Sequence, residues 1–231
     1  MTHEKVAEGV YRLGSPAVNW YLVADGSRFA AIDAGIPTDW DGLVDAMDSL
    51  GGSIGALEAV VLTHGHIDHI GFAERARKEA GARVYVHESD ADNLRSPLAL
   101  AASERSPLLY AARYSATRDL LAAMLRARAP QSKPIRQLTT YKDGDTLSDV
   151  PGKPKVIHTP GHTWGHCALH MPDRRVLFAG DAFVTRNPYT GRMGPEIVSR
   201  AATANSAQAL RSLARLKDIE VDVALTGHGE P

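Results

Sequence analysis

Apolar and polar positions alternate over three short segments near the start of the chain, the pattern of strands with one buried face. Glycines and the Asp25-Gly26 turn separate these segments, so they are expected to pair as an antiparallel meander. The predicted strands cover residues 10–13, 18–23 and 29–32. Apolar residues then recur every three to four positions from Asp39 to Leu50, where two glycines follow, and this stretch is predicted to be a helix.

Short, continuously apolar runs and further helical segments make up most of the remaining chain. Runs of this kind are typical of strands that are buried on both faces. Strands are expected at residues 57–62, 83–86, 155–158, 167–170, 176–179 and 221–225, with helices that end near residue 80 and cover 204–216. This order predicts an α/β fold in which two sheets carry helices on their outer faces.

Residues 95–136 have a different character, rich in alanine, leucine and arginine. The sequence Ser-Pro-Leu occurs twice, and each copy predicts a helix start, because serine caps free N–H groups and proline fits the first helical position. We expect a short helix from Pro97 and a longer one from Pro107 to about Arg128. Eight basic side chains stand against two acidic ones in this segment. We predict that it forms a helical cap over the functional site; a helix pair that only packs on the body is the alternative.

The 231 residues, 44% of them apolar, suffice for one substantial core, and a single domain over residues 1–231 is expected. The 26 basic and 27 acidic side chains nearly cancel, so neither nucleic acid nor an anionic membrane surface is expected as a partner. No apolar run is long enough to span a bilayer, and the N-terminus carries no secretion signal. The single cysteine, Cys167, excludes an intramolecular disulfide and favours a cytoplasmic location. The sequence leaves the oligomeric state open.

Four side chains that can ligate a metal lie within six residues, after a predicted buried strand and before a helix: His64, His66, Asp68 and His69. The glycine between the first two lets both imidazoles turn toward one ion. Asp68 and His69 lie on the next turn and can reach a second ion. A single histidine here would be explained as a polar loop residue, but four ligands together predict a metal site.

Three further patches each place a metal-competent side chain, with a glycine beside it, just beyond the end of a predicted strand. These side chains are His162, Asp181 and His228. Open sheets present their binding sites at such strand ends. The donors are all nitrogen and oxygen, which suits two divalent ions: zinc first, with iron or manganese also compatible.

In their order and spacing these patches resemble the metallo-β-lactamase superfamily, whose pattern is HxHxDH, a downstream His, a bridging Asp or Cys, and a last His. The resemblance covers almost the whole chain. It implies an αββα sandwich of two mixed sheets with outer helices, the metallo-β-lactamase fold, here with a helical insertion. It also implies a ligand assignment: His64, His66 and His162 hold one ion, Asp68, His69 and His228 hold the other, and Asp181 bridges the two.

The resemblance further implies supporting residues and a reaction. Asp33 matches a position that supports the ligands in this family, and His166 is expected to hydrogen-bond a ligand or the substrate. Two ions would lower the pKa of a bridging water and polarise a carbonyl group, while Asp68 would orient the hydroxide and pass on its proton. The expected function is hydrolysis of a carboxylic ester, thioester, lactone or amide of a small molecule.

Several branches of the superfamily share most of this ligand set. Asp181 disfavours a dedicated β-lactamase, since the β-lactamases that resemble this sequence use Cys at that position or lack the bridge. Glyoxalase II enzymes carry a helical glutathione-binding domain after the last histidine; three residues follow His228 here, so neither that domain nor a glutathione thioester substrate is expected. Acyl-homoserine lactonases use a tyrosine at the position of Val184, for which Tyr189 is the nearest substitute.

Three alternatives stay open at this point. A phosphodiesterase of the same fold would be expected to carry a basic RNA-binding arm or a clamping domain, and neither is visible in the sequence. A persulfide dioxygenase would bind one iron and leave the equivalents of Asp68 and His69 off the metal. A non-catalytic binding module would be marked by missing ligands, whereas all seven are present. The ligand set therefore favours a binuclear hydrolase.

The predicted cap supplies the candidates for substrate contact. Tyrosines and apolar residues repeat every three to four positions along its longer helix, with arginines beside them. This pattern favours an acyl or aromatic substrate that bears a carboxylate or phosphate. The candidate substrate-binding residues are Tyr110, Arg113, Tyr114, Arg118 and Tyr189.

Overall fold

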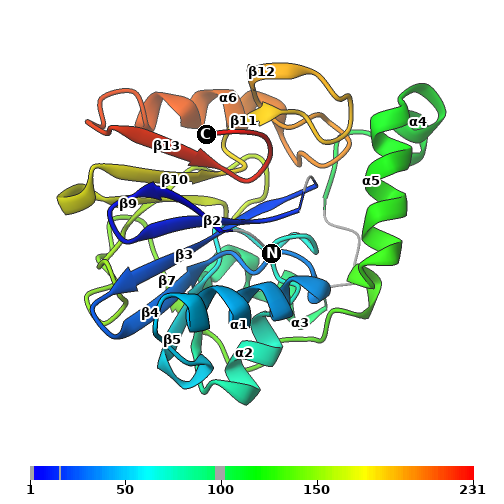
Figure 1. Ribbon diagram of the computed structural model, residues 1–231. Coiled ribbons are helices and arrows are strands. Elements are labelled where there is room, and N and C mark those ends of the chain that lie inside the picture. Colours follow the sequence, from blue (N-terminus) through cyan, green and yellow to red (C-terminus); the bar gives the residue numbers. More distant parts are fainter. Residues whose placement is uncertain (1–2, 16, 97–101) are drawn as a thin grey trace.

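The computed structural model describes residues 3–15, 17–96 and 102–231, which form two facing sheets with helices on their outer sides (Figure 1). The larger sheet holds seven strands in chain order. Strands β1 to β4 are antiparallel neighbours, and β4 to β7 run parallel. Their bounds are β1 (Glu4–Ala7), β2 (Val10–Gly14), β3 (Asn19–Asp25), β4 (Arg28–Ile32), β5 (Leu57–Val61), β6 (Arg83–His87) and β7 (Thr139–Tyr141).

The smaller sheet has four strands in the order β13, β10, β9, β8. Only β10 and β13 are parallel, so this sheet is mixed like the first. A separate hairpin pairs β11 with β12. The bounds are β8 (Lys155–His158), β9 (Cys167–Met171), β10 (Val176–Gly180), β11 (Val184–Arg186), β12 (Met193–Glu196) and β13 (Val223–Thr226).

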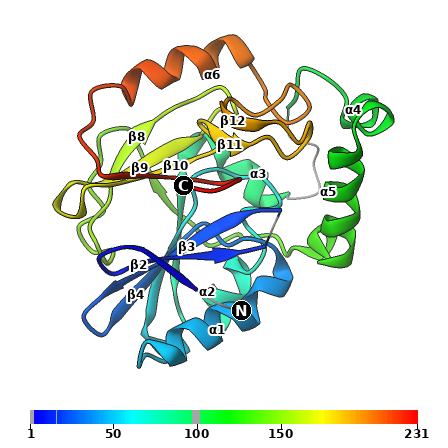
Figure 2. The ribbon, with the colours of Figure 1, turned by 45° about the horizontal axis from the view of Figure 1, so that its top comes forward.

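The helices α1 (Trp40–Ser49) and α2 (Ala73–Glu79) cover the outer face of the seven-stranded sheet, and α6 (Ser206–Ser212) lies over the four-stranded sheet (Figures 1 and 2). The helix α3 (Ala91–Arg95) follows β6. The pair α4 (Pro107–Arg113) and α5 (Ser115–Arg126) stands at the side of the molecule, next to the edge where the two sheets meet. The expected α/β sandwich of two mixed sheets is confirmed.

Alternate residues of β3 serve two separate cores. Trp20 and Leu22 pack with the outer helices, whereas Tyr21 and Val23 face the four-stranded sheet. The rings of Tyr21 and Phe178 meet edge to face, with centroids 5.4 Å apart. Because both faces of the strand are covered, its sequence is apolar almost throughout.

The segment after β6 differs from the sequence prediction. The long helix expected from Pro107 to about Arg128 is wrong: the backbone is extended at Tyr114, with φ −119° and ψ 129°, and separates α4 from α5. Arg118 of α5 donates a hydrogen bond to the carbonyl of Ala111 at 2.7 Å, which satisfies one of the free acceptors at the end of α4. The short helix expected from Pro97 lies outside the described residues.

The remaining differences are at short elements. Strands β1, β7, β11 and β12 were not expected, because each is short and lacks a clear run of apolar residues. The helix expected over 204–216 is α-helical only to Ser212, and a tighter turn completes it. Within the described ranges, no helix combines the length and the apolar character needed to cross a membrane.

The C-terminal end of α5 is anchored on the body of the molecule. Ala127 and Ala129, which follow the helix, are buried together with Val18 and Ile36. Earlier in α5, the buried hydroxyl of Thr117 donates to the carbonyl of Tyr189 at 2.6 Å. The helix is therefore fixed both to the start of β3 and to the loop after β11.

Candidate metal centre

Seven side chains meet at one edge of the sandwich, each just beyond the C-terminal end of a strand. The loop after β5 carries four of them, and the ends of β8, β10 and β13 carry one each. In the four-stranded sheet, β8, β10 and β13 run in the same direction, so their C-terminal ends lie on one side. In the seven-stranded sheet, β5 runs parallel to both of its neighbours. In chain order the side chains are His64, His66, Asp68, His69, His162, Asp181 and His228.

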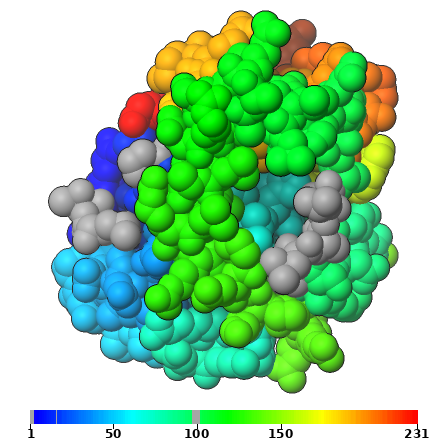
Figure 3. Space-filling model, turned by 90° about the vertical axis from the view of Figure 1, so that its right-hand side faces the viewer, coloured from blue at the N-terminus to red at the C-terminus, as the bar shows by residue number. Residues whose placement is uncertain are grey.

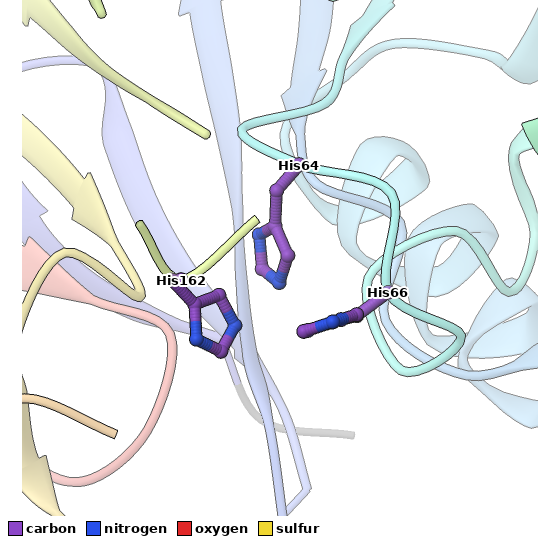
Figure 4. A group of neighbouring side chains, drawn as sticks. All are labelled: His64, His66 and His162. Atoms are coloured by element: carbon purple, nitrogen blue, oxygen red, sulfur yellow. The ribbon is translucent and has the colours of Figure 1, made fainter. Parts of the chain in front are cut away.

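Six of these residues form two groups of three. His64, His66 and His162, here called the first group, offer nitrogens that all lie within 4.8 Å of one another, and Figure 4 shows their rings converging on a common space. Asp68, His69 and His228, here called the second group, offer ligand atoms within the same limit. The spacing of each group suits one metal ion.

Asp181 lies between the two groups. One of its carboxylate oxygens, Oδ2, is 3.3 Å from Nε2 of His162 and 3.2 Å from Nε2 of His228. The other, Oδ1, is 3.8 Å from Nε2 of His69. A Cβ at Gly227 would collide with this carboxylate, so the end of β13 can approach it only with glycine at that position. Asp181 thus occupies the place that a bridging ligand would take.

Buried polar atoms without a protein partner show that these residues fit metal ions. Among the described residues they include Nε2 of His64, His69 and His162, and Oδ1 of Asp181. A buried polar atom left without a partner costs about 1–3 kcal/mol, so four such atoms at one place need a compensating ligand. Imidazole nitrogens with carboxylate oxygens are the donor set of zinc, iron and manganese sites.

The opposite ring nitrogens hold the histidines in this orientation. His228 donates through Nδ1 to the carbonyl of Ala17 at 2.6 Å. Nδ1 of His162 lies 3.4 Å from the hydroxyl of Thr203, whose own proton goes to another carbonyl. Each ring therefore carries a proton on Nδ1 and turns Nε2 toward the other ligands.

Asp33 supports one ligand of each group. Its Oδ2 accepts from Nδ1 of His69 at 2.9 Å, and its Oδ1 accepts from the backbone N–H of Thr63 at 2.7 Å. The hydroxyl of Thr63 donates to Asp33 and so accepts from Nδ1 of His64, which lies 2.9 Å away. Asp33 takes a left-handed backbone conformation, φ 60°, at this position. Asp33 thus contacts His69 directly and His64 through Thr63.

His166 contacts the backbone of Asp181 instead of the ligand atoms. Its Nε2 accepts from the N–H of Asp181 at 2.9 Å, so the proton must lie on Nδ1, which contacts the hydroxyl of Thr159 at 2.8 Å. Burial lowers the pKa of His166 to about 3, and the ring stays neutral. A neutral His166 fixes the start of the loop that carries Asp181.

Burial and charge act differently on the two groups. Burial lowers the pKa values of His64 and His162 well below the usual range, which keeps their nitrogen lone pairs available. Burial also opposes protonation of His69, but the nearby carboxylates, Asp33 and Asp181 first, outweigh it and raise the pKa of His69 to about 10. The second group thus lies in an excess of negative charge, which bound cations would neutralise.

A residue that the sequence did not single out joins the ligand loops. Asp90, fully buried at the start of α3, accepts from the N–H of Gly65 at 2.8 Å and from the hydroxyl of Thr163 at 2.6 Å through Oδ2. Its Oδ1 accepts from the N–H of Gly165 at 2.8 Å. One carboxylate therefore ties together the loops that carry all three histidines of the first group.

Comparison with known proteins identifies the family. The family profile described as the metallo-β-lactamase superfamily matches residues 13–228. The chain belongs to this superfamily. It is 29% identical over 238 aligned residues to a probable metallo-hydrolase from Bacillus subtilis, an alignment that covers 98% of this chain and 86% of that protein.

Solved structures of the metallo-β-lactamase superfamily resemble the chain over nearly its whole length. A metallo-β-lactamase family protein from Thermus thermophilus superimposes with a TM-score of 0.68 at 26% identity, covering 97% of this chain and 74% of that one. A protein crystallised in a di-iron-bound form gives a TM-score of 0.63 at 26% identity, covering 95% and 91%. The chain is therefore assigned to the hydrolases of this superfamily.

Beside the metal centre this superfamily member has a pocket of about 650 Å³. Tyr189 lines it, as do the metal-centre residues Asp68 and Asp181 and four residues of α5 between Leu120 and Leu125. Figure 3 shows α4 and α5 in green across this face, with the surface hollowed beside α5. Residues of α5 and of the candidate metal centre therefore line the same pocket.

The other candidate substrate residues lie away from the pocket lining. Tyr110 reaches it only through Tyr189, with ring centroids 6.4 Å apart, and Tyr110 also contacts Tyr114. The guanidinium of Arg113 lies 5.5 Å from the ring centre of Tyr114, and Arg118 donates to the end of α4. These four residues belong to the α4–α5 junction and are absent from the pocket lining.

Proposed function

We propose that this protein is a binuclear metal-dependent hydrolase that cleaves a carboxylic ester, thioester, lactone or amide of a small molecule. The observation that carries the proposal is the convergence of the first and second groups on either side of Asp181, with the Nε2 atoms of His64, His69 and His162 buried and unpaired. Similarity to a protein crystallised with two irons supports a two-metal site. Zinc is the first candidate, and iron or manganese fits the same donors.

The first group would hold one ion and the second group the other, with Asp181 shared between them. Bound there, two divalent ions would supply Lewis-acid polarisation of a carbonyl group and would lower the pKa of bound water. The side chains of this protein perform the remaining tasks. They must keep the ligands in place, admit the substrate and move a proton.

Asp68 is placed to handle the proton. It is the one carboxylate among the seven that is partly open to solvent, with 17% of its side chain exposed, and it lines the pocket. Its Oδ2 lies 3.6 Å from Nε2 of His228. From this position Asp68 orients the attacking hydroxide and passes its proton to the leaving group. Asp181, by contrast, is only 3% exposed, and its role would be that of the shared ligand.

Tyr189 is the candidate hydrogen-bond donor to the substrate. Burial, together with the negative charges of Asp68 and Asp181, raises the pKa of Tyr189, so its phenol stays protonated at neutral pH. A protonated phenol in the pocket lining can donate to the oxyanion that forms when the carbonyl is attacked. The hydrogen bond from Thr117 to the Tyr189 carbonyl fixes this loop against α5.

The test is a substrate panel on protein of measured metal content. Thioesters, lactones, carboxylic esters, amides, β-lactams and phosphodiesters are compared by kcat/KM, with zinc, iron and manganese quantified in the same samples. We expect about two ions per chain and the highest kcat/KM on one of the carboxylic acid derivatives. A single tightly held iron without hydrolysis would point to a dioxygenase, and a preference for phosphodiesters would overturn the proposed substrate class.

A further inference from the structure

The pocket beside the metal centre has an apolar wall opposite the ligands. Side chains of α5 form much of this wall, and residues from other segments complete it. No lysine or arginine of the described residues takes part in the lining, and the acidic members are the ligands Asp68 and Asp181 themselves. The apolar wall includes Ile67, Leu120, Leu121, Met124, Leu125 and Val198.

The basic side chains of the 95–136 segment are engaged elsewhere. Arg95 pairs with Asp92 at 2.7 Å, and Arg118 donates to the carbonyl of Ala111. Arg113 lies over the ring of Tyr114. These three arginines make contacts outside the pocket, and no basic side chain in the described part of the segment is among the residues that line it, so none is in place to pair with a carboxylate or phosphate there.

The apolar wall is open to a ligand. Leu121 is 38% exposed and Leu125 is 68% exposed, although α5 buries Leu120 and Thr117 against the body. Both leucines line the same pocket as the candidate metal ligands Asp68, Asp181 and His228. A ligand that covered them would gain about 25 cal/mol for each Å² of apolar surface removed from water. A pocket of about 650 Å³ lies in the ordinary range for small-molecule sites.

We propose that the part of the substrate lodged against α5 is an uncharged, apolar acyl chain. This inference rests on the proposed hydrolase function and narrows its substrate class. A carboxylate or phosphate at the far end of the acyl chain would be buried among leucines without a basic partner, which is costly. The geometry thus favours a neutral acyl group over the anionic substrate that the arginine-rich sequence suggested.

A series of nitrophenyl esters tests the proposal. Acetyl, butyryl, hexanoyl and octanoyl esters are compared with esters of the same lengths that end in a carboxylate. We expect kcat/KM to rise by about threefold for each added methylene in the neutral series. The terminal carboxylate should lower kcat/KM at least about tenfold at the octanoyl length. A flat neutral series, or equal values in the two series, would overturn the inference.

Two matched variants separate the pocket wall from general surface effects. Leu121→Asp places a charge on the wall, and the ratio of kcat/KM for octanoyl to acetyl ester should fall at least about tenfold. Leu108→Asp makes the same change at a leucine of α4 that is 76% exposed and does not line the pocket. That variant should keep the wild-type ratio. Equal effects of both changes would refute the role of α5.

A binding measurement distinguishes failure of the inference from failure of the proposed function. The probe is nitrophenyl octyl ether, which is uncharged and cannot be hydrolysed, and its affinity is measured by calorimetry with wild type and both variants. If no ester in the series is cleaved, the hydrolase proposal fails, yet binding lost in Leu121→Asp and kept in Leu108→Asp still supports the apolar site. No binding to wild type would overturn the site itself.

Discussion

At the scale of single residues, Asp181 holds the position on which the two-metal arrangement depends. Its carboxylate lies within 3.3 Å of nitrogens from both groups, and its pKa lies well below the usual range, because the neighbouring His228 and His69 outweigh burial. Without this carboxylate, two divalent ions would face each other with nothing negative from the protein between them. The carboxylate therefore decides whether one or two ions can be held.

We expect Asp181→Ala to bind at most one ion per chain and to lose at least about a hundredfold in kcat/KM. Metal content is measured by elemental analysis after dialysis, alongside turnover of the best substrate of the panel. Asp92→Ala, at a carboxylate whose side chain is 92% exposed, is the matched control and should behave like wild type. Two ions with near-normal turnover in Asp181→Ala would contradict the bridging role.

Asp90 should influence metal binding indirectly, because it holds the loops that carry the first group. In Asp90→Asn one of the two acceptor oxygens becomes an NH₂ group, which leaves a backbone N–H of the ligand loops unpaired. We expect the affinity of the first group for its ion to fall by about 10–100-fold. The free energy of unfolding should fall by about 1–3 kcal/mol.

Competition with a chelator measures the affinity, and Asp92→Asn serves as the control at an exposed position of the same helix. A lower unfolding free energy with unchanged metal affinity would make Asp90 a purely structural residue. This outcome is separable from the expected one because the two quantities are measured independently.

Sequence reasoning named the seven candidate ligands that the structure brings together, but it missed Asp90 for a physical reason. The four ligands after β5 lie on neighbouring positions, so their spacing alone shows that they can meet. The partners of Asp90 are 25, 73 and 75 residues away, and its carboxylate resembles any acidic residue at a helix start. Similarly, Asp33 was noticed through a family resemblance, since its contact with His69 spans 36 residues.

At the scale of secondary-structure elements, the start of α1 contains a buried carboxyl group that links stability to pH. Asp39 is 1% exposed, and its Oδ2 accepts from the N–H of Ile36 at 3.1 Å. Burial exceeds the effect of this hydrogen bond and raises the pKa of Asp39 to about 6 from its usual 3.8. The folded protein therefore holds this proton more tightly than the unfolded chain.

The sign of the pH effect follows from this shift. The stabilisation is fully present below about pH 4 and is lost as the pH rises through about 6, with a total of about 3 kcal/mol at most. In Asp39→Asn the side chain no longer titrates. We therefore expect the unfolding free energy of the variant, relative to wild type, to increase between pH ~4 and pH ~7.

Urea unfolding across this range gives the difference between the two proteins, in which the titration of all other groups cancels. Asp41→Asn, at an exposed position two residues along α1, is the control and should keep the pH dependence of wild type. A constant difference between Asp39→Asn and wild type across the range would show that folding does not raise the pKa of Asp39.

Helices and strands lie where the sequence predicted them when the spacing of nearby residues determines their position. Helix α1 and strands β2 to β4 lie where the apolar period and the glycines placed them. The break between α4 and α5 could not be seen, because Tyr114 and Ser115 carry no helix-stopping signal and the junction is held by side chains one turn or more apart. The same error placed the arginines at the pocket. A single helix continued through Tyr114 was expected to carry Arg113 and Arg118 beside the apolar positions that line the pocket.

At the scale of the whole molecule, the two sheets meet at the metal centre. The seven-stranded sheet supplies the four ligands after β5, and the four-stranded sheet supplies His162, Asp181 and His228. Contacts between the sheets, such as the hydrogen bond of 2.7 Å from the Tyr21 hydroxyl to the Thr226 carbonyl, join residues about two hundred positions apart. The sequence could predict both sheets and their outer helices, but not how their inner faces meet.

Because both groups take ligands from both sheets, metal ions at this site would hold the sheets together. Removing them would leave carboxylates and unpaired nitrogens buried at the edge of the sandwich. A ligand present at about a hundred times its dissociation constant stabilises a fold by about 2.7 kcal/mol per site. For the two sites together this is about 5.4 kcal/mol, which for a chain of this size corresponds to a fall in melting temperature of roughly 10–20 °C when both ions are removed.

We therefore expect chelation to lower the melting temperature by that amount and to speed amide exchange at the loops that follow β5, β8, β10 and β13. The helices α1 and α2 pack on the far side of the seven-stranded sheet and should exchange at nearly the same rate with and without metal. Addition of zinc, iron or manganese should reverse both changes. If verified loss of metal left the melting temperature and the exchange of these loops unchanged, the ions would not be holding the two sheets together, and the ligand assignment across them would have to be abandoned.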